Sequence, residues 1–273
     1  ISNTTFSNNS AATGNGGALG TTGSIYANKC KFLGNYANAK NKSGVIGLSA
    51  NSSAYFNSCE FRDNYVNNVT NGGPIIYTSE TTCALGFNNC FLTNNNSQKT
   101  SFFVCTSSSC IMANTTFIDN SLEATNASLL YMLGNGSQYT CVNNIIINKN
   151  TSYYGFRNSG TNSLTTCHNI YSKPMGVTSG IGDLPEIYSL SEEVAKISTD
   201  TDMSYYSWSG SVEGFLYTNK TNVANTIKSN ETFGLDFYNW LTSLDYGNGL
   251  NALDVDIRGV ERTQTVWPGS YQN

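Results

Sequence analysis

Charge, histidine and proline are scarce in this sequence, and each shortage narrows what the protein can be. Charged residues make up only 12% of the chain, roughly half the usual share of about 25%. The net charge of −4 offers no basic surface for nucleic acid or anionic lipid. No apolar run approaches the roughly 20 residues that a membrane-spanning helix needs. We therefore expect no nucleic-acid partner and no membrane span in this chain.

Patterns for catalysis or metal binding are equally sparse. His168 is the single histidine, which excludes a histidine-based triad or a multi-histidine metal site. The eight cysteines lack paired Cys-x-x-Cys spacing, so zinc is not expected. Asp63 and Asp119 take equivalent places in the repeat described below, but two repeats apart. That gap of roughly 10 Å is too wide for a tight pair of hydrolase carboxylates, so we predict neither an enzyme nor a cofactor.

What the sequence has in abundance is one repeated phrase. Residues 57–64 read Asn-Ser-Cys-Glu-Phe-Arg-Asp-Asn, and residues 28–35 read Asn-Lys-Cys-Lys-Phe-Leu-Gly-Asn. In each copy an apolar anchor is followed by Asn at the third position after it. The anchors fall at residues 6, 32, 61, 92, 117 and 147, with spacings of 26, 29, 31, 25 and 30 residues. A repeat of this length is typical of a solenoid.

Each repeat contains three short apolar patches separated by turns rich in Asn, Gly, Ser and Thr. In the first copy the patches lie at Phe6, Gly16–Leu19 and Ser24–Tyr26. Strands this close leave no room for crossover helices, and stacking each coil on the last satisfies their backbone groups. Pro74 is the single proline before residue 170, as central strands require. The sequence predicts an all-β, right-handed parallel β-helix with three short strands per coil of about 25–31 residues.

The anchors and the asparagines that follow them are predicted to stack along this solenoid. Asparagine accepts the left-handed turn conformation, and its amide can bond to the amides above and below, as in other stacked-strand ladders. The predicted ladder positions are Asn9, Asn35, Asn64, Asn95, Asn120 and Asn150, with Phe6, Phe32, Phe61 and Phe117 among the anchors. Asn95 and Asn150 also lie in Asn-x-Ser/Thr sequons. Because a ladder side chain faces inward, we predict that both are unmodified.

The cysteines fall into two groups. Three of them lie two residues before successive anchors, namely Cys30, Cys59 and Cys90. These should stack in neighbouring coils; adjacent strands lie within disulfide reach, but we favour buried thiols acting as small hydrophobes. The better disulfide candidates are Cys105 with Cys110 and Cys83 with Cys110. An even number of cysteines permits such bonds without establishing them.

Sequons are numerous but not far above expectation. The chain contains twelve, and its 38 asparagines would give roughly nine by chance. An extracellular setting would nevertheless make glycosylation reasonable. The candidate glycosylation sites are Asn3, Asn41, Asn51, Asn68, Asn114, Asn126, Asn135, Asn219 and Asn230.

The character of the chain changes after residue 172, where cysteine disappears and all three tryptophans lie. Residues 1–172 are predicted to form the coils. Residues 173–273 are predicted to add irregular coils and a partly helical cap that covers the last coil. One short helix is predicted at Ser189–Ile197, with Ser191 as its cap. A second is indicated by apolar residues at helical spacing, namely Phe233, Phe237, Trp240, Leu241 and Leu244.

Acidic residues near the end leave two interpretations open. Asp254, Asp256 and Glu261 could bind calcium. The interpretation we favour is that an aspartate pairs with Arg258 or Arg262 and bridges the closing turn.

A family resemblance is carried by the first copy of the repeat. Phe6–Ala11, read Phe-Ser-Asn-Asn-Ser-Ala, is followed by Gly-Gly-Ala-Leu at Gly16–Leu19. This resembles the polymorphic outer membrane protein repeat of adhesin-like surface proteins, over roughly residues 1–150. Residues 253–262 and 268–272 look like the terminal strand pair of secreted β-helix proteins. The resemblance implies a surface-exposed right-handed β-helix used for adhesion or structure, and it transfers no catalytic residue.

These observations predict an extracellular surface or fibre glycoprotein with a structural or adhesive role. Ile1 begins almost inside a coil, so we expect upstream sequence or another subunit to cover that end. Head-to-tail assembly into a filament follows as a hypothesis, since such a contact need not close. Partners would be further copies of the chain, or glycans and proteins of a cell surface. The competing classes are a polysaccharide-active lyase or hydrolase and a carbohydrate-binding module.

Overall fold

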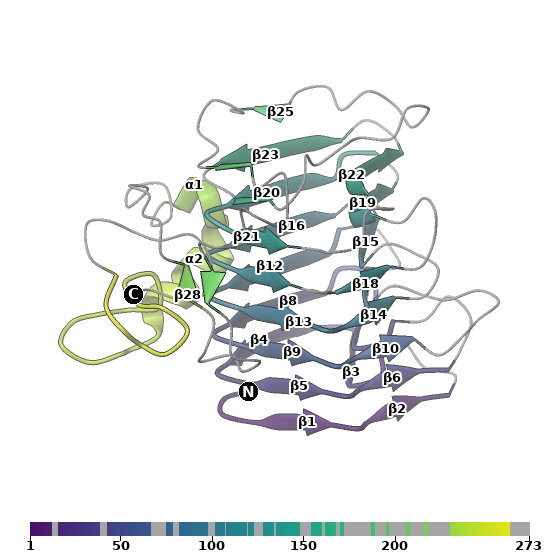
Figure 1. Ribbon diagram of the computed structural model, residues 1–273, viewed down its shortest axis with the longest axis horizontal. Helices are drawn as coiled ribbons and strands as arrows, with labels where there is room; N and C mark the ends of the chain where they lie inside the picture. Colours follow the sequence, from purple (N-terminus) through teal and green to yellow (C-terminus); the bar gives the residue numbers. More distant parts are fainter. Residues whose placement is uncertain are drawn as a thin grey trace.

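The protein is an all-β solenoid of stacked parallel strands (Figure 1). The computed structural model describes residues 1–12, 16–38, 43–66, 75–78, 82–97, 102–106, 108–118, 120–122, 128–133, 135–147, 154–159, 162–167, 170–171, 187–188, 195–196, 206–207, 216–217 and 230–262. Along the stack, each strand pairs in parallel with its counterpart in the next coil, from β1 with β5 to β24 with β26. The predicted parallel β-helix is confirmed.

The strands form four parallel sheets, numbered here in chain order. The first sheet holds β1 (Thr5–Ser7), β5 (Lys31–Leu33), β9 (Glu60–Arg62), β13 (Phe91–Thr93), β17 (Thr116–Ile118), β21 (Ile145–Ile147), β24 (Ile170–Tyr171) and β26 (Ala195–Lys196). The second holds β2 (Ser10–Ala11), β6 (Tyr36–Ala37), β10 (Tyr65–Val66), β14 (Asn96–Ser97) and β18 (Ser121–Leu122).

The third sheet holds β3 (Leu19–Thr21), β7 (Ile46–Leu48), β11 (Ile76–Thr78), β15 (Phe103–Thr106), β19 (Ser128–Leu133) and β22 (Tyr154–Ser159). The fourth holds β4 (Ser24–Asn28), β8 (Ser53–Asn57), β12 (Ala84–Asn88), β16 (Ser109–Ala113), β20 (Gln138–Val142), β23 (Ser163–Cys167) and β25 (Ile187–Tyr188). A separate antiparallel pair is formed by β27 (Tyr206–Ser207) and β28 (Leu216–Tyr217).

The second sheet adds a fourth strand to the first five coils, so the prediction of three strands per coil was wrong. Its strands are two residues long and directly follow the ladder asparagine. One side chain of each strand points inward, so Ala37 and Val66 are fully buried. The other points outward, where Tyr36 and Tyr65 stack with ring centroids 4.9 Å apart. A single inward residue per strand is too little for an apolar patch to stand out in the sequence.

The register of the first sheet stacks the predicted anchors directly above one another. The column contains Phe6, Phe32, Phe61, Leu92, Phe117 and Ile146. The sixth anchor is therefore Ile146, and the prediction of residue 147 was wrong by one position. Residues 145–147 are three identical isoleucines, so side-chain type could not reveal which of them pairs with Phe117.

The core is a continuous interior stack of aromatic rings. Phe32 lies parallel to Phe6 on one side, at 5.0 Å, and to Phe61 on the other, at 4.6 Å. Phe56 and Phe87 of the fourth sheet stack on each other at 5.2 Å, and Phe56 meets Phe32 edge-on. Each such pair contributes about 0.5–1.5 kcal/mol beyond area burial, so neighbouring coils are held in register from inside.

Residues 230–262, called here the C-terminal segment, lie against the side of the solenoid (Figure 1). This segment contains α1 (Asn230–Phe233) and α2 (Leu235–Ser243), so a helix is present where the apolar spacing predicted one. It packs on the outer face of the fourth sheet, however, and not on the last coil. Phe237 stacks on Tyr55 at 4.8 Å. Helical periodicity identifies an apolar face but not the surface that it covers.

The other predicted helix is wrong where the structure describes it. Ala195–Lys196 forms strand β26, which pairs in parallel with β24. Ser191 and the remaining residues of that prediction lie outside the described residues. Pairing with the strand of the previous coil satisfies the backbone groups of β26, and this tertiary contact overrides local helix propensity.

Candidate functional site

The first asparagine column lies at the corner between the first and second sheets. It contains Asn9, Asn35, Asn64, Asn95 and Asn120, five of the six predicted ladder asparagines. Oδ1 of Asn64 accepts hydrogen bonds from Nδ2 and the backbone N of Asn35, at 3.0 and 2.9 Å. Nδ2 of Asn64 donates to Oδ1 of Asn95 at 2.7 Å and to the carbonyl of Phe32 at 2.9 Å. The inner amides are therefore fully used by the neighbouring coils.

The sixth predicted member, Asn150, lies outside the described residues. Counted from the true anchor Ile146, the equivalent position in the sequence is Lys149, which also lies outside them.

A second asparagine column, which the sequence reasoning missed, lies at the corner between the fourth and first sheets. It contains Asn28, Asn57, Asn88, Asn114 and Asn143, joined by Nδ2-to-Oδ1 hydrogen bonds of 2.7–2.9 Å. Its signal was visible as the Asn that opens the phrase in three copies. The column then moves one residue along the chain, because Asn88 pairs in register with Ala113 while Asn114 donates to it. That shift removed the later members from a fixed-spacing pattern.

The second column overturns one predicted glycosylation site. Asn114 is fully buried, and its Nδ2 donates to Asn88 Oδ1 at 2.8 Å. N-glycosylation occurs at this same nitrogen, so Asn114 cannot carry a glycan in the folded protein.

The cysteines stack next to this second corner. Cys30, Cys59 and Cys90 are buried thiols, and the backbone N of Cys30 donates to Cys59 Sγ at 3.4 Å. A similar hydrogen bond from a backbone N to a side chain of the next coil is donated by Cys90, to Thr115 Oγ1. Burial raises the pKa of Cys59 well above its ordinary value. The sulfur atom of Cys59 thus accepts an inter-coil hydrogen bond as the asparagine oxygens do.

The predicted bond between Cys83 and Cys110 is wrong. Neither residue forms a disulfide and both are buried, and Leu85 is the residue opposite Cys110 in the register. Cys83 instead donates from Sγ to the Ser49 carbonyl at 3.1 Å. Because Cys110 forms no disulfide, the predicted bond from Cys105 to Cys110 is wrong as well.

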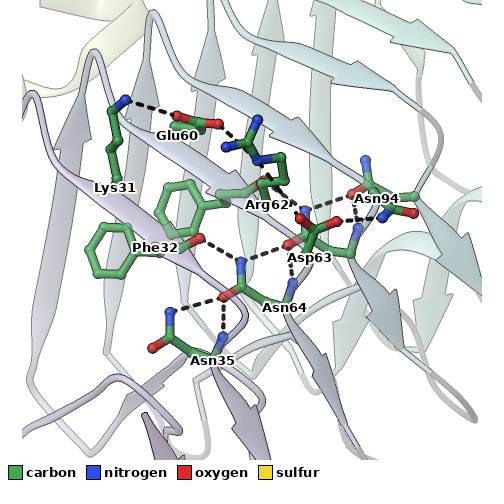
Figure 2. A network of polar contacts seen from close by, with 11 residues as sticks. Lys31, Phe32, Asn35, Glu60, Arg62, Asp63, Asn64 and Asn94 are labelled. Atoms are coloured by element: carbon green, nitrogen blue, oxygen red, sulfur yellow. Dashed lines mark hydrogen bonds and ion pairs between the residues drawn. The ribbon is translucent and has the colours of Figure 1, made fainter. Parts of the chain in front are cut away.

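Outside the first asparagine column lies a charged network (Figure 2). The side chain of Glu60 is only 6% exposed and lies between two cations: Lys31 Nζ at 3.6 Å and Arg62 Nε at 3.3 Å. Arg62 Nε also lies 3.8 Å from Asp63 Oδ2, and Asn94 Nδ2 donates to Asp63 Oδ1. The guanidinium stands between the two carboxylates, where a hydrolase pair would leave space for sugar and water. Asp119, the other predicted partner of Asp63, lies outside the described residues.

The C-terminal segment is fastened to the second asparagine column by polar contacts. Asn57 Nδ2 donates to the Tyr246 hydroxyl at 2.9 Å, and that hydroxyl lies 3.3 Å from Asn28 Oδ1. Burial is the main cause that raises the pKa of Tyr246. Lys29 Nζ lies 4.3 Å from the centre of its ring, a distance typical of a cation–π contact.

A second fastening point lies one coil further on. Asn89 Nδ2 donates to the carbonyls of Ala252 and Val255, at 3.1 and 2.8 Å. Arg262 Nη2 donates to Asn89 Oδ1 at 2.8 Å. Burial lowers the pKa of Arg262 to about 10. One solenoid side chain thereby holds both strands of the closing turn, which are linked by a single antiparallel bridge between Val255 and Glu261.

The two interpretations of the acidic residues are separated by the contacts of Asp256. Its Oδ2 accepts bonds from Arg258 Nε at 2.9 Å and Nη2 at 2.7 Å, and its Oδ1 accepts backbone N–H groups of Arg258 and Val260. Asp256 is fully buried, so an internal ion pair bridges the turn. Among the described residues, no three His, Cys, Asp or Glu side chains gather as a metal-binding group.

The remaining sequons divide by exposure. Asn3, Asn8, Asn51 and Asn135 are exposed, whereas Asn95 is fully buried in the first column. The side chain of Asn230 is outside what the structure describes, as are the candidates Asn41, Asn68, Asn126 and Asn219.

Comparison with known proteins adds no relative. No protein-family model matches the chain, and neither a curated protein nor a solved structure matches it. The described helices include none long and apolar enough to cross a membrane. The fold and its columns define the protein as a parallel β-solenoid with internal asparagine ladders and a side-docked C-terminal segment.

Proposed function

We propose that this chain is a structural or adhesive protein of an extracellular surface, and that it acts as a stiff spacer or scaffold. The observation that carries the proposal is the use of corner side chains for contacts between coils. Both asparagine columns join successive coils through buried hydrogen bonds. The stability of a solenoid depends on contacts between adjacent repeats, and buried hydrogen bonds at two corners of each coil strengthen those contacts, which favours a rigid rod.

The outer charged network supports a non-catalytic role. Glu60 and Asp63 both face Arg62, and a carboxylate neutralised by a cation is poorly placed to donate or accept a proton during hydrolysis. The charged groups of this corner form ion pairs with one another. This favours a surface that supports contacts over one that performs chemistry.

Two features are compatible with an extracellular location. The sequon asparagines Asn3, Asn51 and Asn135 are exposed at the surface, where glycans could be attached. The described thiols are buried, and burial raises the pKa of Cys59. Because the thiolate is the reactive form, such cysteines resist oxidation in an oxidising medium.

Surface labelling tests the proposal. Antibodies raised against the purified chain should label intact native cells as strongly as permeabilised ones, and beads coated with the chain should bind to host or neighbouring cells. Label that appears only after permeabilisation would overturn the extracellular role. Release of reducing or unsaturated sugar from polysaccharides would favour the enzyme class, and glycan-array binding without turnover would favour a carbohydrate-binding module. Head-to-tail assembly stays a prediction, and light scattering of the intact chain at rising concentration tests it.

A further inference from the structure

The twelve sequons are not equivalent once the chain is wound, because the winding turns some asparagine side chains inward. In Asn95 and Asn114 the amide nitrogen donates hydrogen bonds within a buried column, to Asn120 Oδ1 and Asn88 Oδ1 at 2.8 Å each. A sugar on either nitrogen would replace a donated hydrogen and place a bulky polar group inside the wall. Folding and modification exclude each other at these two positions.

Asn51 has the opposite environment. It lies in the turn between β7 and β8, is exposed, and has a φ of 57°, a left-handed conformation that asparagine tolerates. Its Oδ1 accepts a hydrogen bond from Thr82 Oγ1 in the next coil, which fixes the orientation of the amide. Its Nδ2 has no hydrogen-bond partner in the part of the chain that the structure describes, so the reactive nitrogen is available.

Asn135 occupies the same corner of the solenoid further along the axis. It is exposed and lies in the turn between β19 and β20. The strands that follow the two sequons, β8 and β20, belong to the fourth sheet and are separated by β12 and β16. Three strand spacings make about 14 Å, so both sequons line one edge of the rod.

We propose that Asn51 and Asn135 carry N-linked glycans and that Asn95 and Asn114 do not, an inference that rests on the extracellular role proposed above. The co-reactant is an oligosaccharide linked through its anomeric carbon to a lipid pyrophosphate. The amide nitrogen forms a bond to that carbon, the carbon–oxygen bond to the pyrophosphate breaks, and the lipid pyrophosphate leaves. One amide proton is lost to a base, and no oxidation or reduction occurs.

The corner between the first and second sheets contains two described sequons, those of Asn8 and Asn95. Asn95 is fully buried and its amide donates to Asn120, whereas Asn8 is exposed.

Peptide mapping of the full chain secreted from cultured animal cells tests the assignment. After enzymatic release of N-glycans in heavy-oxygen water, we expect the label at Asn51 and Asn135 in most molecules and none at Asn95 or Asn114. Label at Asn95 or Asn114 in secreted, folded protein overturns the assignment, as does an unlabelled Asn51 or Asn135. Secretion imposes exposure to the glycosylation enzymes, so these outcomes are independent of where the native protein resides, which the antibody experiment measures.

Two variants serve as controls on the assignment. Asn51→Gly retains the left-handed turn, because glycine adopts positive φ freely, and Asn135→Gln replaces an exposed side chain. Each variant should be secreted at the same level as the chain without substitutions. Its gel mobility should show the loss of one glycan, and that of the double variant the loss of two. Unchanged mobility of either single variant overturns the assignment at that position.

Discussion

Nδ2 of Asn64 donates a hydrogen bond of 2.7 Å to Oδ1 of Asn95, a residue 31 positions further along the chain. Both side chains are fully buried, and each is held by the coil below and the coil above. A buried amide with all its hydrogen-bonding groups satisfied is stabilising, whereas the loss of one partner leaves several groups unpaired. The stability of the stacked coils therefore depends on individual asparagines.

Removal of an inner ladder amide should be costly. In Asn64→Ala the backbone N and Nδ2 of Asn35 lose their shared acceptor, and the carbonyl of Phe32 loses a donor. At about 1–3 kcal/mol for each unpaired buried group, we expect the free energy of unfolding to fall by at least about 3 kcal/mol in urea titrations. The matched control is Asn9→Ala, at the exposed end of the column, with an expected loss of about 1 kcal/mol. Equal losses in the two variants would contradict the buried-ladder interpretation.

The docking of the C-terminal segment depends on the absence of a side chain at Gly86. A Cβ placed there would lie 2.5 Å from Cε1 of Phe237 and 2.8 Å from Cδ1 of Tyr55, closer than packed carbon atoms approach. We expect Gly86→Ala to push α2 off the fourth sheet, at a cost of about 1–3 kcal/mol, with faster amide hydrogen exchange in Leu235–Ser243. Gly23→Ala is the control, since its Cβ would approach only Thr21 Oγ1, at 4.0 Å. Unchanged exchange in α2 of the Gly86 variant would show that the segment docks elsewhere.

The repeat could be predicted from the sequence because equivalent positions in successive coils have the same residue types. Phe followed by Asn at a fixed offset is unusual enough to align coils, and the register places Phe32 opposite Phe61. The prediction of the sixth anchor failed because residues 145–147 are identical isoleucines, which residue type cannot distinguish. The second asparagine column was not predicted from the sequence, because Asn114 lies one position later in the register than Asn88. The place where a helix docks depends on the shape of the surface that receives it. No local sequence pattern indicates that Gly86 leaves space for the ring of Phe237.

Alkaline pH should loosen the docked segment. Burial raises the pKa of Tyr55 to about 12, above the ordinary value near 10. The folded state therefore holds this proton more tightly than the unfolded state, so the contribution is complete below pH 10 and is lost as pH rises towards 12. We expect exchange in α2 to accelerate over that window. The change should be smaller in Tyr55→Phe, which retains the stacked ring on Phe237 without an ionisable hydroxyl. Arg262, whose pKa is lowered, acts in the opposite direction and is common to both proteins. An identical pH dependence in the two proteins would exclude Tyr55 as the cause.

The thiol column should be inert in the folded protein and reactive in the unfolded one. Cys59 is fully buried, and burial is the largest cause that raises its pKa. A thiol must ionise before it reacts with an alkylating reagent. Burial of Cys59 limits both the access of the reagent to its sulfur and the population of its thiolate. Mass spectrometry after brief treatment with an alkylating reagent should find Cys30, Cys59 and Cys90 unmodified at neutral pH, and all three modified in concentrated guanidinium chloride. Asn64→Ala offers a graded control, because the less stable solenoid opens more often. The modification rate of Cys59 should rise by the same factor as the population of the open state. Rapid modification of Cys59 in the intact protein would mean that the wall opens without global unfolding, and that the columns do not hold the coils as a unit.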